Sequence, residues 1–136
     1  MPSSSDTAKR LIGTWRLVSI TRKGKADPNR GRHPTGLIQY DGTGHMAVQI
    51  MPDRVRGYAG SEPTPDEAKA AMTGYTAYFG TYTIDESART VTHHRTGNIH
   101  PDSLIDVVRR YEFASGDRLI LRPVENQDEL TWERIK

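Results

Sequence analysis

The feature that most constrains the fold is the regular punctuation of the chain by turn-forming residues. Segments rich in Gly, Pro, Asp and Asn recur along the 136 residues, and between them lie short stretches of alternating apolar and polar side chains. Such alternation is the pattern of half-buried strands joined by tight connections. We therefore predict an all-β protein. The expected strands lie near residues 14–22, 36–41, 45–51, 78–84, 89–96, 106–114, 117–122 and 129–135.

One segment interrupts the strand pattern and predicts a short helix near residues 65–73. Thr64 is a suitable N-cap, Pro65 suits the first helical position, and Glu67 stands where a capping box needs it. A second short helix is expected around residues 5–11, before the first strand.

Eight antiparallel strands in one sheet leave two exposed edges, which closure into a barrel removes. We predict a single domain over residues 1–136, built as an eight-stranded up-and-down β-barrel. A barrel of this size has an interior that can hold one small ligand. The segment "MPDRVRGYAG" of residues 51–60 and the helix after it are expected to cover one barrel end, either by packing against the mouth or as a gate.

Composition and charge narrow the classes of partner. The net charge of +2 is too small to indicate nucleic-acid binding, and no apolar run approaches the ~18 residues that would span a membrane. The basic run from Arg22 to Arg32 is expected to be a solvated connection. The absence of cysteine excludes disulfides and Cys-ligated zinc and fits a cytoplasmic location.

Several phrases of the chain resemble a known family. The "GTW" of residues 13–15 and an Arg on the last strand are similar to the lipocalin and fatty-acid-binding superfamily, the calycins. More narrowly, an ordered set of phrases resembles the bacterial and fungal lipocalin-like domain family. These phrases are "GTWRLVS", "PTGLIQYDGTGHMAVQI", "YFGTYTID", "TVTHH" and "RRYEFASGDRLILR".

The resemblance implies a ligand-enclosing barrel with Trp15 at its floor. In such barrels a basic side chain from the last strand packs on this Trp, and Arg134 is the expected partner. Classical secreted lipocalins carry disulfides and a signal peptide. Since this sequence shows neither, we do not expect an extracellular transport role.

Strand alternation selects the residues expected to face the interior. Neighbouring side chains on a strand diverge, so His93 is the inward candidate and His94 its alternative. On the adjacent strand Arg109 and Tyr111 are expected inward, but a one-residue slip of the register would bring Arg110 inward instead.

The expected ligand-contacting side chains combine aromatic surface with a few polar groups. For each tyrosine, core packing is an equal alternative, and for His93 the main alternative is a hydrogen-bonded interior histidine without a catalytic task. These residues are Tyr40, Tyr78, Tyr82, His93, Arg109 and Tyr111.

Three functions are compatible with such an interior. The favoured one is the binding of a small, mostly apolar or amphipathic molecule with one polar end. The second is an isomerase, cyclase or hydratase of secondary metabolism, in which His93 moves a proton and Arg109 stabilises negative charge. The third comes from the resemblance, since calycin-like barrels that bind haem through one His also carry a "GTW" start: a haem-binding barrel with His93 as axial ligand.

Other properties are open or expected to be absent. No metal site is predicted, because His93 and His94 diverge on a strand and no cysteine is available. No cofactor other than the haem of the third alternative is expected. Whether the protein is an enzyme, which molecule it takes and whether it forms a dimer are open.

Overall fold

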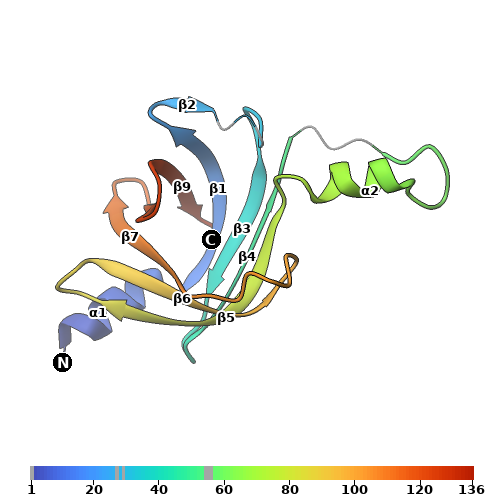
Figure 1. The fold of residues 1–136 in the computed structure, drawn as a ribbon. Helices are drawn as coiled ribbons and strands as arrows, with labels where there is room; N and C mark the ends of the chain where they lie inside the picture. The colour runs from blue at the N-terminus through green and yellow to red at the C-terminus, as the bar shows by residue number, and fades with distance from the viewer. Residues whose placement is uncertain (1, 27, 29, 54–56) are drawn as a thin grey trace.

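The computed structural model describes residues 2–26, 28, 30–53 and 57–136, with side chains from Asp6 onward. Within these residues eight antiparallel strands close into a barrel, and a two-residue strand, β2, extends from β1 (Figure 1). Every predicted strand is present within two residues of its expected bounds, so the predicted barrel is confirmed. The strands are β1 (Gly13–Arg22), β2 (Lys25–Ala26), β3 (Thr35–Tyr40), β4 (His45–Met51), β5 (Thr76–Asp85), β6 (Thr90–Asn98), β7 (Val107–Ala114), β8 (Arg118–Pro123) and β9 (Asp128–Arg134).

The pairing of β1 with β9 closes the barrel, and a bulge interrupts it. The register between the two strands shifts between Leu17 and Ser19. Simple alternation from Trp15 predicts Ser19 on the inner face, but the extra residue of the bulge places Ile20 there, 3% exposed. The bulge therefore keeps an apolar side chain on the inside while β1 bends.

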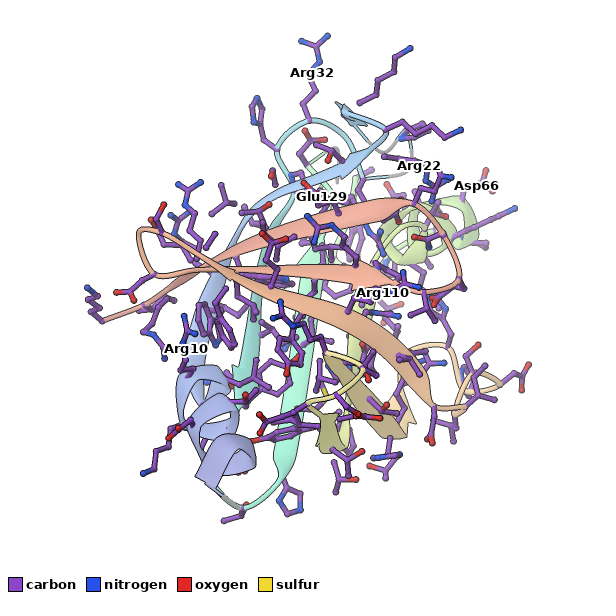
Figure 2. All side chains as sticks on the ribbon, turned by 90° about the vertical axis from the view of Figure 1, so that its left-hand side faces the viewer. Arg10, Arg22, Arg32, Asp66, Arg110 and Glu129 are labelled. Atoms are coloured by element: carbon purple, nitrogen blue, oxygen red, sulfur yellow. The ribbon has the colours of Figure 1, made fainter. Side chains whose placement is uncertain are left out.

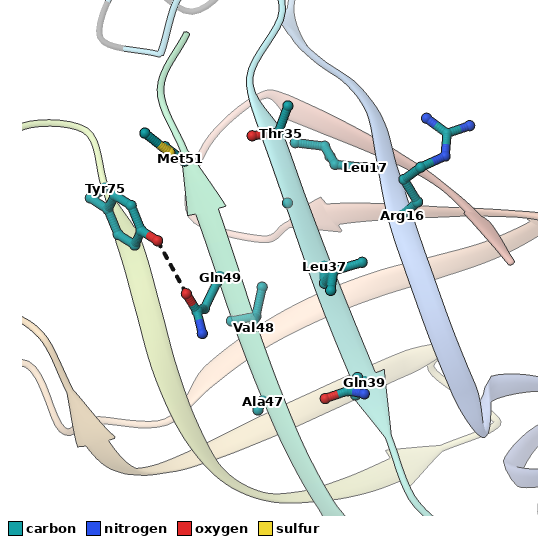
Figure 3. A pocket seen from close by; sticks show the side chains of 11 residues that line it. Arg16, Leu17, Thr35, Leu37, Gln39, Ala47, Val48, Gln49, Met51 and Tyr75 are labelled. Carbon is teal, nitrogen blue, oxygen red and sulfur yellow. Dashed lines mark hydrogen bonds between the residues drawn. The ribbon is translucent and has the colours of Figure 1, made fainter. Parts of the chain in front are cut away.

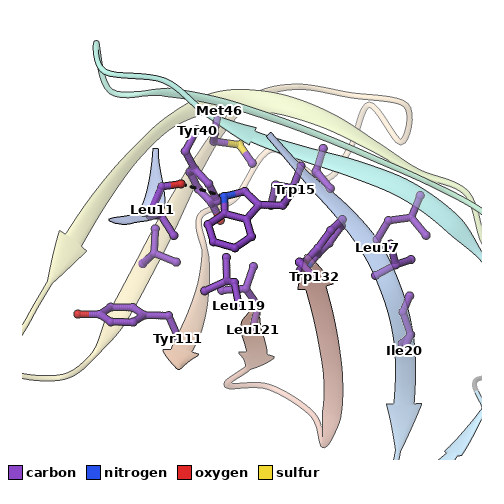
Figure 4. Close-up of a cluster of buried hydrophobic side chains, with 14 of the residues drawn as sticks. Leu11, Trp15, Leu17, Ile20, Tyr40, Met46, Tyr111, Leu119, Leu121 and Trp132 are labelled. Carbon is purple, nitrogen blue, oxygen red and sulfur yellow. Dashed lines mark hydrogen bonds between the residues drawn. The ribbon is translucent and has the colours of Figure 1, made fainter. Parts of the chain in front are cut away.

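Large apolar side chains fill the barrel end where β1 begins. Figure 4 shows Trp15 beside Leu11, Tyr40 and Met46, with Trp132 further along the barrel next to Leu17. Trp15 and Trp132 are each 1% exposed. This apolar cluster fixes the floor of the barrel and leaves any interior space toward the other end.

The described residues include two helices outside the barrel wall. α1 (Pro2–Leu11) ends in the fully buried Leu11, whose carbonyl accepts a hydrogen bond of 2.9 Å from Trp15 Nε1. α2 (Pro65–Met72) begins with the predicted capping box, in which Thr64 and Glu67 bond reciprocally.

The place of α2 differs from the expectation. None of its residues is buried, and in Figure 1 it stands away from the barrel, so the prediction that the insertion covers the barrel end is wrong for its helical part. Its helical face carries too little apolar surface to hold it down. Part of the preceding segment, residues 54–56, lies outside the described residues.

The outer surface of the barrel is rich in charged side chains. Arg110 is exposed on β7, and Arg32 extends into solvent (Figure 2). In the described ranges, no helix is long and apolar enough to cross a membrane.

Candidate functional site

The barrel interior holds a cavity of about 350 Å³. It lies toward the ends of β1 and β9 that are distant from Trp15, and Arg22 and Asp128 pair there. Its volume is at the small end of the roughly 300–1,000 Å³ range of ligand pockets. The apolar part of its lining comes from Ile38, Val48, Ile50, Leu121, Pro123 and Leu130, and the polar interior groups are Tyr78, His93, Arg109 and Trp132.

His93 is the centre of the polar interior. The side chain is 1% exposed, its Nε2 lies 2.6 Å from the hydroxyl of Tyr40, and its Nδ1 lies 2.7 Å from the hydroxyl of Tyr78. Burial, followed by the positive charges of Arg109 and Arg95, lowers the pKa of His93 to about 3. The imidazole is therefore neutral at neutral pH.

The two tyrosines that contact His93 keep their protons. Burial raises the pKa of Tyr40 well above its ordinary value. Burial also raises the pKa of Tyr78, and the nearby guanidinium of Arg109 only partly opposes this effect. Both side chains therefore remain phenols that can donate hydrogen bonds.

Arg109 brings a positive charge into the cavity from β7. Its side chain is 16% exposed, and its Nη1 lies 3.2 Å and 3.4 Å from the two carboxylate oxygens of Glu125. Because Glu125 is itself 54% exposed, water screens this ion pair on the outer side. Nη1 also donates to the carbonyl of Val108 at 3.3 Å, so among the described residues these bonds use Nη1, and Nε and Nη2 can donate to another partner.

Trp132 is a cavity residue that the sequence reasoning did not select as a site residue. Its indole lines the cavity, and Nε1 is buried without a hydrogen-bond partner among the described residues. Alternation along residues 129–135 predicts that Trp132 shares the inner face with Leu130. No sequence signal indicated that its N–H would be unpaired, because that depends on which acceptors surround it.

Polar side chains at the cavity mouth were also outside the predicted set. Arg22 forms an ion pair of 2.6 Å with Asp128, and Arg30 Nη2 donates to Thr76 Oγ1 at 2.7 Å. Arg22 and Arg30 belong to the basic run that was expected to be a solvated connection. The structure instead brings both to the rim of the cavity.

The predicted interior residues divide into two groups. Tyr78, His93 and Arg109 line the cavity. Tyr40 and Tyr111 are buried outside its lining, Tyr40 bonded to His93 and Tyr111 packed against the ring of Phe113.

Tyr82 also lies outside the lining of the cavity. It is half-buried, and its hydroxyl donates to the carbonyl of Asp41 at 2.7 Å. Its aromatic ring packs edge-on against Tyr40, with ring centroids 4.9 Å apart. Tyr82 therefore supports Tyr40 from the floor side of the barrel.

The structure resolves the choice between neighbouring residues on two strands. His93 and Arg109 point inward, whereas His94 and Arg110 lie on the outer side. Outside, His94 Nδ1 lies 2.9 Å from Asp106 Oδ2 and Nε2 lies 2.9 Å from Thr83 Oγ1. These bonds connect β5 and β6 to the start of β7. In the part of the chain that the structure describes, no group of three or more His, Cys, Asp or Glu side chains is arranged to hold a metal.

The floor of the barrel has the geometry that the "GTW" resemblance implies. The Arg134 guanidinium carbon lies 4.2 Å from the ring centroid of Trp15, and Nη1 donates to the carbonyl of Ile12 at 2.8 Å. Gly13 has φ +145°, and a Cβ there would lie 2.7 Å from Arg134 Nη1. Gly13 is thus required both by its backbone conformation and by the close approach of Arg134.

Comparison with known proteins identifies the family. A family model described as "Lipocalin-like domain" matches residues 12–135. The chain belongs to this family. No curated protein matches the lipocalin-like chain at a significant level.

One similar solved structure is a DUF4847 family protein from Bacteroides vulgatus. It is 14% identical to the lipocalin-like chain, with a TM-score of 0.49, and the match covers 93% of this chain and 94% of that one. A similarity of this size supports no inference about the function of the lipocalin-like chain.

A second hollow lies on the outer face of the lipocalin-like barrel. Figure 3 shows it over β3 and β4, with Leu37 and Met51 on its surface and Tyr75 donating to Gln49 Oε1 at 3.1 Å. Its volume is about 520 Å³, but its polar groups are exposed to water. The interior cavity is the better candidate site, because its polar groups are buried.

Proposed function

We propose that this lipocalin-like protein binds a small molecule with a polar group and an apolar body inside its barrel. The observation that carries the proposal is the interior cavity of about 350 Å³, in which Tyr78, His93 and Arg109 stand among aliphatic side chains. The surface of this cavity is more polar than apolar, and polar groups fixed in position beside apolar side chains give a ligand pocket its specificity. Arg109 and Tyr78 would hold the polar end, and Val48 and Leu121 would contact the apolar body.

An enzymatic role through His93 is less well supported by this geometry. A general base or acid works best with a pKa near the working pH. The pKa of His93 is lowered to about 3, and both of its ring nitrogens already meet tyrosine hydroxyls. Proton transfer by His93 would break a bond to Tyr40 or Tyr78.

The hydrogen bonds of His93 also argue against the haem alternative. An axial histidine offers a bare ring nitrogen to the iron. In His93 both nitrogens are within 2.7 Å of a tyrosine oxygen, so one of these contacts would have to open before a metal could bind. The residues present therefore do not fit an axial site without rearrangement.

The test is native mass spectrometry of protein purified without denaturant, compared with the same protein after denaturation. We expect an additional mass on the folded protein that is lost on denaturation. Val48→Phe, which fills the cavity from β4, should abolish it, and Gln49→Phe on the outer face of the same strand should retain it. A visible spectrum of the same sample reports haem.

Each result has a distinct meaning. An extra mass that survives Val48→Phe but is lost in Gln49→Phe would move the site to the outer hollow and contradict the proposal. Absence of any copurified mass, together with failure of every added small molecule to bind, would remove the binding function. Thermal unfolding of both variants checks that they are folded.

A further inference from the structure

The hydrogen bonds around His93 determine which protons face the cavity. A neutral imidazole has one N–H donor and one bare nitrogen that accepts. Since both ring nitrogens of His93 meet tyrosine hydroxyls, one tyrosine donates to the ring and the other accepts from it. The accepting tyrosine keeps its own O–H proton for another partner.

Tyr40 is the tyrosine that donates. It is 1% exposed, and within the described residues its hydroxyl bonds only to His93. If Tyr40 accepted from the imidazole, its own proton would be buried without an acceptor, which is costly. The proton of the imidazole is accordingly assigned to Nδ1, which donates to the oxygen of Tyr78.

Tyr78 is then left with an O–H to donate at the cavity wall. Its oxygen receives the Nδ1–H of His93, and the guanidinium of Arg109 is close enough to act on the phenol by charge and hydrogen bonding. Because the oxygen of Tyr78 accepts from His93 and its other neighbour, Arg109, is a donor, the hydroxyl proton is available to a different partner. Both Tyr78 and Arg109 line the cavity.

The remaining polar groups of the cavity also favour a negatively charged occupant. The two acids at the mouth, Glu125 and Asp128, are each paired with an arginine. The buried N–H of Trp132 is a further donor without a partner among the described residues. The described lining residues include three arginines, Arg22, Arg30 and Arg109, and two acids, so the cavity keeps an excess of one positive charge and offers hydrogen-bond donors.

We propose that the ligand is a compact carboxylate whose head group accepts hydrogen bonds from the Tyr78 hydroxyl and the Arg109 guanidinium. Two parallel N–H groups of Arg match the two oxygens of a carboxylate, and such charge-assisted bonds are stronger than neutral ones. The apolar body of the ligand lies against Val48, Ile50 and Leu121. This inference rests on the proposed binding function and specifies the chemistry of the polar end.

The test compares acids with their uncharged amides on the same scaffolds. The probes are benzoate, cyclohexanecarboxylate and 2-naphthoate, each beside its primary amide, titrated by calorimetry at neutral pH. We expect at least one acid to bind about 10-fold or more tightly than its amide, as the loss of a charged hydrogen bond implies. If the amide binds as tightly as the acid on every scaffold that binds, the proposal that the ligand is a carboxylate is wrong.

Two substitutions on adjacent positions of β7 provide the matched variants. Arg109→Met should abolish the preference for the acid, and Arg110→Met on the outer face should leave it unchanged. Tyr78→Phe should weaken the acid more than the amide. Retention of the full preference in Arg109→Met would exclude this arginine as the anchor.

The two tryptophans locate the binding event. The chain contains two Trp residues, so an amide-correlation NMR spectrum shows two indole N–H signals. The signal of Trp132, which lines the cavity, should shift on addition of the acid, whereas that of Trp15, bonded to Leu11, should stay in place. Binding without a Trp132 shift would place the acid elsewhere and contradict the proposal.

The carboxylate proposal and the binding function can fail separately. If none of the six probes binds while an uncharged molecule copurifies in the cavity, the carboxylate proposal fails and the binding function stands. If nothing copurifies and no small molecule of any charge binds, both fail.

Discussion

At the scale of single residues, Gly13 and Arg134 show how closely the floor is specified. Arg134 stacks on Trp15 and bonds to the carbonyl of Ile12, and a Cβ at Gly13 would force its guanidinium to shift. From the sequence, "GTW" is recognisable as a motif, but the reason for the Gly is not. The structure explains the Gly by its φ of +145° and by the neighbouring guanidinium.

We expect Gly13→Ala to destabilise the protein by about 1–3 kcal/mol, because it combines backbone strain with displacement of Arg134. Gly24→Ala is the control. Its φ of +79° is also strained, but nothing lies within 4 Å of the added Cβ, so a loss of roughly 1 kcal/mol is expected. The free energies of unfolding come from urea titrations. Equal losses in both variants would show that Arg134 moves aside freely.

At the scale of secondary-structure elements, α2 behaves differently from the strands. The strands are coupled to one another through the closed ladder, whereas α2 has no buried residue and is held by its own caps. Its capping box was readable in the sequence because it involves residues three positions apart. Its position off the barrel was not readable, since it depends on contacts with distant elements.

Thr64→Ala should therefore loosen α2 without weakening the barrel. Loss of the N-cap costs a helix about 1 kcal/mol, so hydrogen exchange at the amides of Glu67 and Ala68 should become faster. The global free energy of unfolding should change by less than about 0.5 kcal/mol, as for surface substitutions generally. Ser61→Ala, an exposed change outside the helix, serves as the control. A large fall in global stability would mean that α2 packs on the barrel in solution.

At the scale of the whole molecule, His93 connects distant parts of the barrel. It lies on β6 and bonds to Tyr40 on β3 and Tyr78 on β5, so its neutral form is part of the folded interior. Its pKa falls from 6.5 in the unfolded chain to about 3 in the folded protein. Between these pH values the unfolded state binds the additional proton, so acid favours unfolding.

The free energy of unfolding should consequently decrease by up to about 1.4 kcal/mol per pH unit through His93 as the pH falls from 6.5 toward 3. Above pH 6.5 His93 is neutral in both the folded and the unfolded state, so it adds no further dependence of stability on pH. Gln at position 93 keeps an acceptor and donors for the two tyrosines but does not titrate. In His93→Gln the slope of the free energy of unfolding against pH should therefore fall by the equivalent of about one proton. If His93→Gln and the unchanged protein lost stability equally as the pH falls, the lowered pKa of His93 would be contradicted.

The sequence by itself determined the eight strands and the family, and it favoured His93 and Arg109 over His94 and Arg110 as the inward residues. Alternation, turn residues and capping depend on neighbours within a few positions, and closure follows from the need to pair strand edges. The β1 bulge was not predictable, because it depends on the register with β9. Only the tertiary structure decided that Tyr78 and Arg109 share a cavity with Trp132 while Tyr40, Tyr82 and Tyr111 do not line it. The reason is physical: whether an inward side chain meets a cavity or another side chain depends on the volumes of residues far away in the chain.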